Sequence, residues 1–122
     1  MSEKRILIFD NDFILIDALK IIFSENDWVT HDQSMANNAL ESLELVRPDI
    51  VMVDSHYKLG SAEIINLLRH HPDFNKIPVI LMSTNNHVLE TAQSAGADDY
   101  IRKPFSIDEL ERKIFDLLKD QC

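Results

Sequence analysis

Two aspartates, a serine and a lysine stand at or just after the ends of short apolar runs, and these residue types could together carry phosphate chemistry. They are Asp10, Asp54, Ser83 and Lys103. Two carboxylates brought close together repel one another unless a proton or a cation lies between them. Lys103 supplies one positive charge, and Mg2+, which binds through one or two carboxylates together with phosphate oxygens, is a natural second partner. An aspartate beside such an ion can attack a phosphoryl group and carry it as an acyl phosphate, with Ser83 and Lys103 holding the transferred oxygens.

The apolar runs themselves predict the strands that would place these residues. A short continuous apolar run is typical of a strand buried on both faces of a parallel sheet. A fifth and more polar run, Trp28–His31, is expected nearer a sheet edge. The other four expected strands are Arg5–Phe9, Ile50–Val53, Val79–Met82 and Tyr100–Ile101.

Between the runs, apolar residues recur at helical spacing and predict five helices. A helix from about Phe13 to Ile22 comes first, and the last opens at the capping box Ser106-Ile107-Asp108-Glu109. Gly96 would close the fourth in a left-handed conformation. The middle three are marked by Ala39–Val46, ending before Pro48, by Ile64–Leu68, stopping at Pro72, and by Val88–Ala95.

Strands that alternate with helices through short links imply right-handed crossovers and an α/β fold, a doubly wound parallel sheet covered on both faces. Ligands bind such sheets beyond the carboxyl ends of the strands. Asp10, Asp54, Ser83 and Lys103 are therefore expected on one rim of the sheet.

Length and composition restrict the function further. The 122 residues fit one domain, 1–122, with its core at about 4–118. Twelve Lys and Arg against 21 Asp and Glu give a net charge of -9, which disfavours direct binding to nucleic acid or to an anionic membrane. Only two glycines occur, so neither glycine-rich phosphate loop can be built, and phosphate must be held by side chains. The lone Cys122 excludes an intrachain disulfide and fits a reducing, cytoplasmic location.

Four segments, taken in order, resemble the receiver domain of two-component response regulators. They are Ile6–Asp10, Pro48–Asp54, Pro78–Ser83 and Gly96–Phe105. The resemblance runs over nearly the whole chain and implies a flavodoxin-like sheet in the order 2-1-3-4-5, a domain that is not an enzyme, and a cytoplasmic protein.

The resemblance also implies roles for individual residues. Asp54 matches the phosphoacceptor, and Lys103 matches the lysine that neutralises the phosphate. Ser83 matches the residue whose hydroxyl bonds the phosphoryl group, and Tyr100 the aromatic that swings inward when that bond forms. The Lys103–Pro104 peptide is expected to be cis.

Partners follow from the same resemblance. The phosphoryl group would come from a sensor histidine kinase or a phosphotransfer protein. The signal would leave through the fourth helix, fifth strand and fifth helix, about 86–119, to an output protein or an output domain outside this chain, and a homodimer would be one possible form.

The implied Mg2+ site departs from the family pattern. Its protein ligands would be Asp10, Asp54 and the backbone carbonyl of His56, but Asn11 stands where the family usually has a second acid. An amide oxygen can coordinate Mg2+, yet the site loses a negative charge, so weaker binding is expected. Asp12 could restore that charge or could serve at a helix N-terminus.

The loop after Asp54 departs as well, because Ser55–Ser61 replaces the usual Met-Pro-Gly-x-Asp-Gly sequence and is one residue shorter. Asn11 and this loop leave open a degenerate receiver that acts as a phosphorylation-independent interaction module.

A third interpretation starts from Ile6–Asp12, which also looks like the first motif of haloacid-dehalogenase-type phosphatases. Three features argue against a phosphatase. Lys103 follows the pair Asp98-Asp99 rather than preceding it, the chain is short for that family, and Asp54 would have no role.

Overall fold

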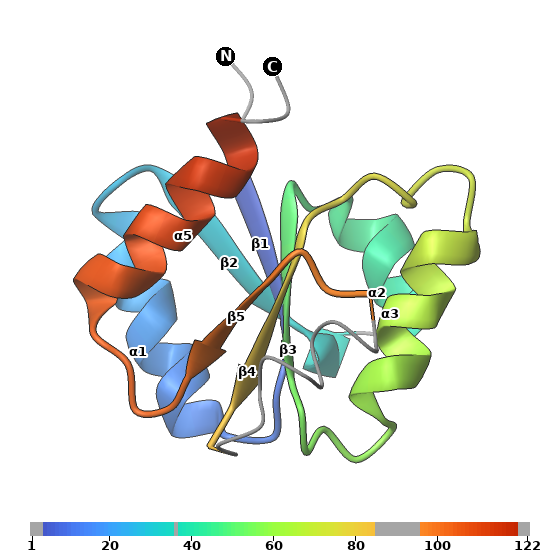
Figure 1. Ribbon diagram of the computed structural model, residues 1–122, viewed down its shortest axis with the longest axis horizontal. Coiled ribbons are helices and arrows are strands. Elements are labelled where there is room, and N and C mark those ends of the chain that lie inside the picture. Colours follow the sequence, from blue (N-terminus) through green and yellow to red (C-terminus); the bar gives the residue numbers. More distant parts are fainter. Residues whose placement is uncertain (1–3, 36, 85–95, 120–122) are drawn as a thin grey trace.

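The computed structural model describes residues 4–35, 37–84 and 96–119, and its centre is a five-stranded parallel sheet (Figure 1). The strand order is β2-β1-β3-β4-β5, as expected. β2 is an edge strand, in keeping with its more polar sequence. The strands are β1 (Lys4–Phe9), β2 (Trp28–Asp32), β3 (Ile50–Asp54), β4 (Val79–Ser83) and β5 (Asp99–Arg102).

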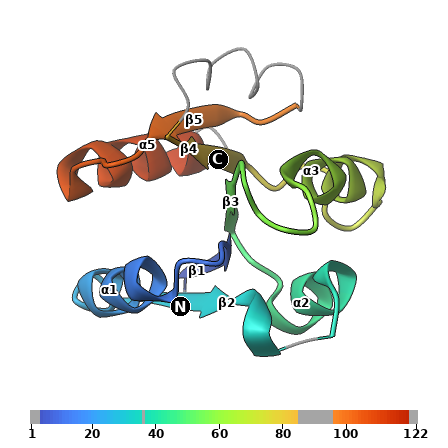
Figure 2. The ribbon, with the colours of Figure 1, turned by 90° about the horizontal axis from the view of Figure 1, so that it is seen from below.

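Helices cover both faces of the sheet, which confirms the doubly wound α/β class. α1 and α5 lie on one face and α2 and α3 on the other (Figures 1 and 2). The predicted helix at Val88–Ala95 lies outside the described residues. A short 3-10 turn, η1 (Gln33–Met35), was not predicted. The described α-helices are α1 (Phe13–Ser24), α2 (Ala39–Val46), α3 (Ser61–His70) and α5 (Ile107–Lys119).

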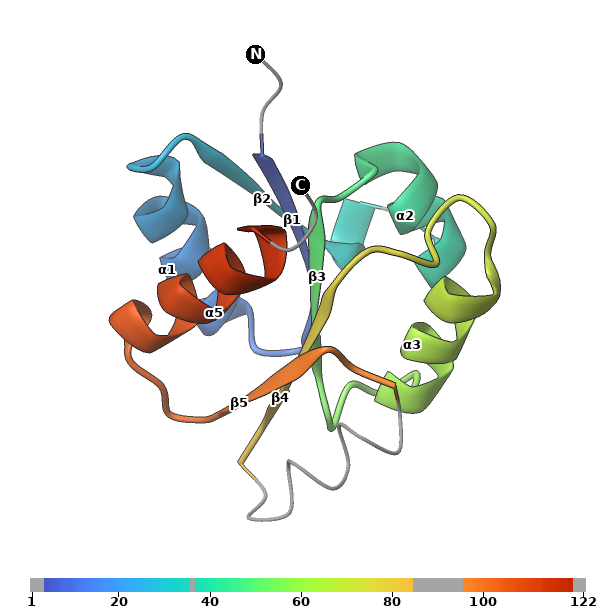
Figure 3. The same cartoon turned by 45° about the horizontal axis from the view of Figure 1, so that its top comes forward.

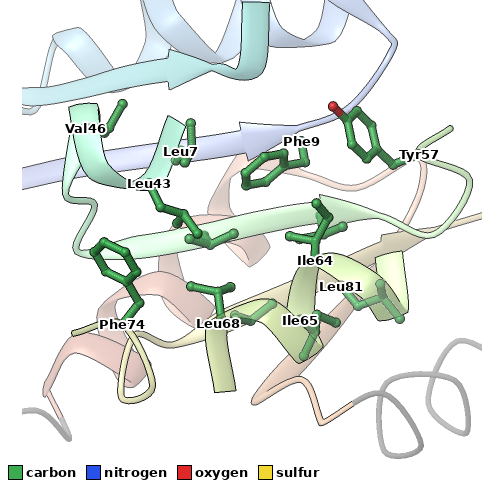
Figure 4. Close-up of a cluster of buried hydrophobic side chains, with 13 residues drawn as sticks. Leu7, Phe9, Leu43, Val46, Tyr57, Ile64, Ile65, Leu68, Phe74 and Leu81 are labelled. Atoms are coloured by element: carbon green, nitrogen blue, oxygen red, sulfur yellow. The ribbon is translucent and has the colours of Figure 1, made fainter. Parts of the chain in front are cut away.

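The two faces of the sheet build two hydrophobic cores. Successive strand residues point to opposite faces, so Leu7 and Phe9 of β1 face α2 and α3, whereas Ile6 and Ile8 face α1 and α5. Figure 4 shows the first core, with side chains of α2 and α3 packed against those of the sheet. All four of these β1 side chains are fully buried, which explains the unbroken apolar run.

Local signals in the sequence set where the helices begin and end. The Asp12 side chain caps α1 by accepting a hydrogen bond from the Leu15 N–H, and Asn38 caps α2 through the Glu41 N–H. The Ser106 hydroxyl accepts from the Glu109 N–H at 3.1 Å, as the capping box predicts. Gly60 precedes α3 with a φ of 91°, a conformation that favours glycine.

Candidate functional site

Parallel pairing aligns the carboxyl ends of the strands on one rim (Figure 3). Asp54 and Ser83 are the last residues of β3 and β4, Asp10 directly follows β1, and Lys103 directly follows β5. The Lys103 N–H donates to the Ser83 carbonyl at 2.8 Å, which fixes β5 beside β4 at this point. The expected gathering of these residues on one rim is therefore found.

Lys103 bridges the two aspartates. Its Nζ lies 2.7 Å from Asp10 Oδ2 and 3.0 Å from Asp54 Oδ1. The Lys103 side chain is 16% exposed, and those of Asp10 and Asp54 are 4% and 13% exposed, so water screens these ion pairs only weakly. Burial alone would lower the pKa of Lys103, but the hydrogen bonds and charges of Asp10 and Asp54 outweigh burial and raise it above 10.5.

Both aspartates are also held by the backbone of the segments that follow them. Asp10 Oδ1 accepts the Asp12 N–H at 2.9 Å, and Asp54 Oδ2 accepts the His56 N–H at 3.0 Å. Each carboxylate thus presents one oxygen to Lys103 and turns the other to a turn of its own chain. These contacts fix both carboxylates in one orientation, side by side across the β1–β3 boundary.

The loop after Asp54 closes tightly despite its unusual sequence. The Tyr57 N–H donates to the Asp54 carbonyl at 3.0 Å, and the Gly60 N–H donates to the Tyr57 carbonyl at 2.8 Å. Tyr57 is only 6% exposed and its ring packs edge-on against Phe9, 5.7 Å between centroids (Figure 4). This loop is therefore anchored in the core by an aromatic residue.

Asn11 lies at the mouth of the site and is exposed. Its Oδ1 accepts the Lys58 N–H at 3.3 Å and so joins the start of α1 to the loop after β3. Beside it, a hollow of about 280 Å3 is lined by residues of both segments and of the α2 N-terminus, including Asn11, Lys58 and Leu59.

Asp12, for which two roles were open, is the N-cap of α1: its Oδ1 accepts the Leu15 N–H at 3.1 Å. Asp98, just before β5, is exposed and accepts from the Arg69 guanidinium at 2.6 Å and from the Val79 N–H at 2.7 Å. It therefore has a structural role between α3, β4 and β5.

Tyr100, in β5, is half-buried and packs at the edge of the first core. The ammonium of Lys113 lies 5.1 Å from the centre of its ring. The Lys103–Pro104 peptide is cis, as the resemblance predicted. The inward swing of Tyr100 stays a prediction.

The donor set suits a hard cation. Asp10 and Asp54 offer carboxylate oxygens and Asn11 an amide oxygen, the ligand types that Mg2+ prefers. Within residues 4–35, 37–84 and 96–119, no cluster of three or more His, Cys, Asp or Glu could hold a metal ion. Any cation site here thus depends on two acids, together with neutral oxygens such as those of Asn11 and the His56 carbonyl.

Three contributors to this region were missed by sequence reasoning. Ser55 Oγ lies 2.8 Å from Ser83 Oγ, Tyr57 anchors the loop, and Gln33 Nε2 donates to the Asp10 carbonyl at 2.9 Å. A signal existed for Tyr57, an aromatic in an otherwise polar loop. For Gln33 and Ser55 the contacts depend on turn geometry that residue types do not reveal.

Lys103 also bears on the phosphatase interpretation, because it contacts Asp54 at 3.0 Å as well as Asp10 at 2.7 Å, so Asp54 belongs to the same cluster of charges. Among the helices that the structure describes, none is long and apolar enough to cross a membrane.

Comparison with known proteins supports the resemblance. The family model of the response regulator receiver domain matches residues 6–115. The response regulator MprA of Mycobacterium leprae is 33% identical over 121 residues, which cover 94% of this chain and 51% of MprA. The heme response regulator HssR of Staphylococcus saprophyticus is 34% identical over 116 residues, 93% of this chain and 50% of HssR. The chain thus spans about half the length of these curated relatives.

A solved structure agrees on the fold. The receiver domain of the Pseudomonas aeruginosa sensor histidine kinase PA1611, crystallised with a magnesium ion in its active site cleft, superposes with a TM-score of 0.81. The alignment covers 97% of this chain and 99% of that domain at 18% sequence identity.

Proposed function

Because this chain belongs to the response regulator receiver domain family, we propose that it accepts a phosphoryl group on Asp54 and passes the change to a partner. The observation that carries the proposal is the bridge of Lys103 to Asp10 and Asp54, at 2.7 and 3.0 Å. A cation held against two weakly exposed carboxylates offsets their mutual repulsion and can also offset the charge of an arriving phosphate.

The reaction assigns one role to each residue. An Asp54 carboxylate oxygen attacks the phosphorus atom of a phosphohistidine, the P–N bond breaks, and the imidazole leaves and takes up a proton. The Lys103 ammonium contacts the phosphoryl oxygens and neutralises part of their charge, and the Ser83 hydroxyl donates a hydrogen bond to one of them. Mg2+, held by Asp10, Asp54, Asn11 and the His56 carbonyl, would supply further charge neutralisation. The donor would be a histidine kinase or phosphotransfer protein, in the cytoplasm.

The output of this proposal is a shift between two conformations. The phosphoryl oxygens stabilise the state in which the Ser83 hydroxyl bonds one of them and Tyr100 has swung inward, and this shifts the conformation of the surface that a partner binds. β5 and α5 form part of that surface, and the remaining part, at 86–95, lies outside the described residues. The output protein or output domain is not in this chain.

A phosphorylation assay tests the proposal. The protein is incubated with acetyl phosphate and Mg2+, and intact mass is followed over time. We expect the mass of one added phosphoryl group, absent in Asp54→Ala and in samples with excess chelator. An adduct that persists in Asp54→Ala would place the modification elsewhere and overturn the assignment.

A second candidate is favoured by Asn11 and the two-acid site: a receiver that signals through protein contacts alone. A Mg2+ titration followed by NMR separates the two. Saturable shifts of the amides near Asp54 at millimolar-order Mg2+ support the phosphoacceptor. Flat shifts, together with no phosphoryl adduct, support the interaction module.

A further inference from the structure

Ser55, the residue directly after Asp54, places a hydroxyl against Ser83. The two Oγ atoms are 2.8 Å apart, and Ser55 Oγ also lies 3.2 Å from Nδ1 of His56. Ser83 is 1% exposed and Ser55 is half-buried. The Ser55 N–H donates to the Met82 carbonyl at 2.8 Å, which continues the β3–β4 ladder and holds Ser55 in place. The Ser83 carbonyl likewise accepts the Lys103 N–H, so strand hydrogen bonds hold the backbone on both sides of the hydroxyl contact.

A hydroxyl carries one proton and two acceptor lone pairs, so the row His56, Ser55, Ser83 can be ordered in two directions. In one, His56 Nδ1–H donates to Ser55 and Ser55 donates to Ser83. In the other, Ser83 donates to Ser55 and Ser55 donates to the imidazole. Only in the first direction is the Ser83 proton not donated to Ser55, so that Ser83 can donate it to another acceptor.

We propose that Ser55 is a positioning residue that orients the Ser83 hydroxyl toward a phosphoryl group on Asp54. The inference rests on the proposed phosphorylation of Asp54 and adds a residue to it. When Ser55 donates to Ser83, one lone pair of the Ser83 oxygen accepts that hydrogen bond and the Ser83 O–H points away from Ser55. Both serines adjoin the phosphoacceptor, Ser55 in sequence and Ser83 one residue beyond Met82, the β4 partner of Asp54. The proposal assigns the oriented proton to the transferred oxygens.

A hydrogen-bonded chain is stronger when every donor points the same way. A phosphoryl oxygen that accepts from Ser83 favours the direction in which Ser55 and His56 also donate toward it. Loss of the Ser55 hydroxyl removes this alignment but leaves the backbone intact. We expect a modest effect, roughly 2- to 10-fold in the rate of phosphorylation, the usual net value of one hydrogen bond.

The test is a double-mutant cycle on the full chain. Ser55→Ala, Ser83→Ala and the double variant are phosphorylated with acetyl phosphate and Mg2+, and initial rates are measured by intact mass. If Ser55 acts through Ser83, Ser55→Ala slows the reaction in the wild-type background and has no further effect in the Ser83→Ala background. Ser55→Thr, which keeps the hydroxyl, restores most of the rate.

A matched control and the contrary outcomes complete the experiment. Ser24→Ala removes a hydroxyl that donates to the Ile21 carbonyl at the far end of α1, and it should leave the rate unchanged. An equal loss from Ser55→Ala in both backgrounds, or no loss in either, overturns the role of Ser55 while Asp54 remains the phosphoacceptor. Wild-type protein that takes up no phosphoryl group at all overturns the proposed function and this inference together.

Discussion

Asn11 determines the charge of the proposed cation site. Around the ammonium of Lys103 the site holds two carboxylates, those of Asp10 and Asp54, and the third side-chain oxygen comes from a neutral amide. Lys103 offsets one of the two negative charges, so an arriving Mg2+ meets only about one net negative charge. We therefore expect the low net charge at this position to weaken Mg2+ binding.

Asn11→Asp should strengthen Mg2+ binding. One added charge in contact with a divalent ion, in a partly solvated site, contributes about 1–2 kcal/mol, a roughly 5- to 30-fold tighter dissociation constant. Isothermal titration calorimetry of both proteins measures the change. Asn66→Asp is the matched control, because it adds the same charge on the exposed side of α3. An equal gain in both variants would indicate a general effect of net charge and would remove Asn11 from the ligand set.

At the scale of elements, Asp12 has its effect through α1. The first N–H groups of a helix lack intrahelical partners, and the Asp12 carboxylate accepts one of them, from Leu15. The backbone N–H of Asp12 is meanwhile engaged with Asp10 Oδ1. Asp12 therefore links the first turn of α1 to the Asp10 carboxylate.

Asp12→Ala should lower the free energy of unfolding by about 1 kcal/mol, within the usual range of about 0.5–2 for a lost N-cap. Asp12→Asn, which keeps the accepting oxygen, should stay close to wild type. Urea denaturation measures both. A loss of Mg2+ affinity in both variants as large as that caused by Asp10→Asn would instead make Asp12 a ligand of the ion.

Gly60 ends the loop after Asp54 in a conformation that other residues avoid. Its φ is 91°, and a Cβ there would clash with Glu63 Oε2. The Glu63 side chain can move aside, but the backbone strain cannot be relieved in this way. Gly60→Ala should cost roughly 1–3 kcal/mol of stability.

The Glu63→Ala background separates the two causes. If backbone strain dominates, Gly60→Ala costs nearly as much in this background as in the wild-type protein. A cost that vanishes once the Glu63 side chain is truncated would assign the whole effect to the steric clash. Thermal and urea unfolding of the four proteins supply the comparison.

Elements that a local pattern specifies were predicted well from the sequence. The run Ile6–Phe9 is buried on both faces, and the Ser106 capping box starts α5 where expected. The gathering of Asp10, Asp54, Ser83 and Lys103 followed from the rule that parallel strands end on one rim. The 3-10 turn and the Ser55–Ser83 contact did not follow, because they join side chains through loop geometry that has no sequence period.

At the scale of the molecule, Lys103 joins three strands. It follows β5, and its ammonium binds carboxylates at the ends of β1 and β3. Lys103 thus offsets part of the charge of these two acids in a chain whose net charge is -9. Without Lys103, the Asp10 side chain, which is 4% exposed, would lie close to Asp54 with no ammonium between the two carboxylates.

Lys103→Met should therefore destabilise the protein at pH 7 in the absence of Mg2+. Removing one partner of a buried ion pair costs about 3–5 kcal/mol, and we expect about 3 because Asp54 and Lys103 keep some contact with water. Urea unfolding of the wild-type and Lys103→Met proteins measures this difference in stability. Millimolar Mg2+ should narrow it, since the freed carboxylates can then share the ion.

The difference in stability between the wild-type and Lys103→Met proteins should also depend on pH, and it should fall as the pH rises. The folded-state pKa of Lys103 is raised above the unfolded value of about 10.5. Its stabilisation is therefore complete below pH 10.5 and is lost as the pH rises through the folded-state pKa. Burial also raises the pKa of Tyr57, but Tyr57 is present in both proteins and cancels in the difference. Urea unfolding should show the same difference in stability at pH 7 and pH 9, and a smaller difference above pH 10.5. A difference that persists at the highest pH would mean that the Lys103→Met substitution disturbs packing rather than charge.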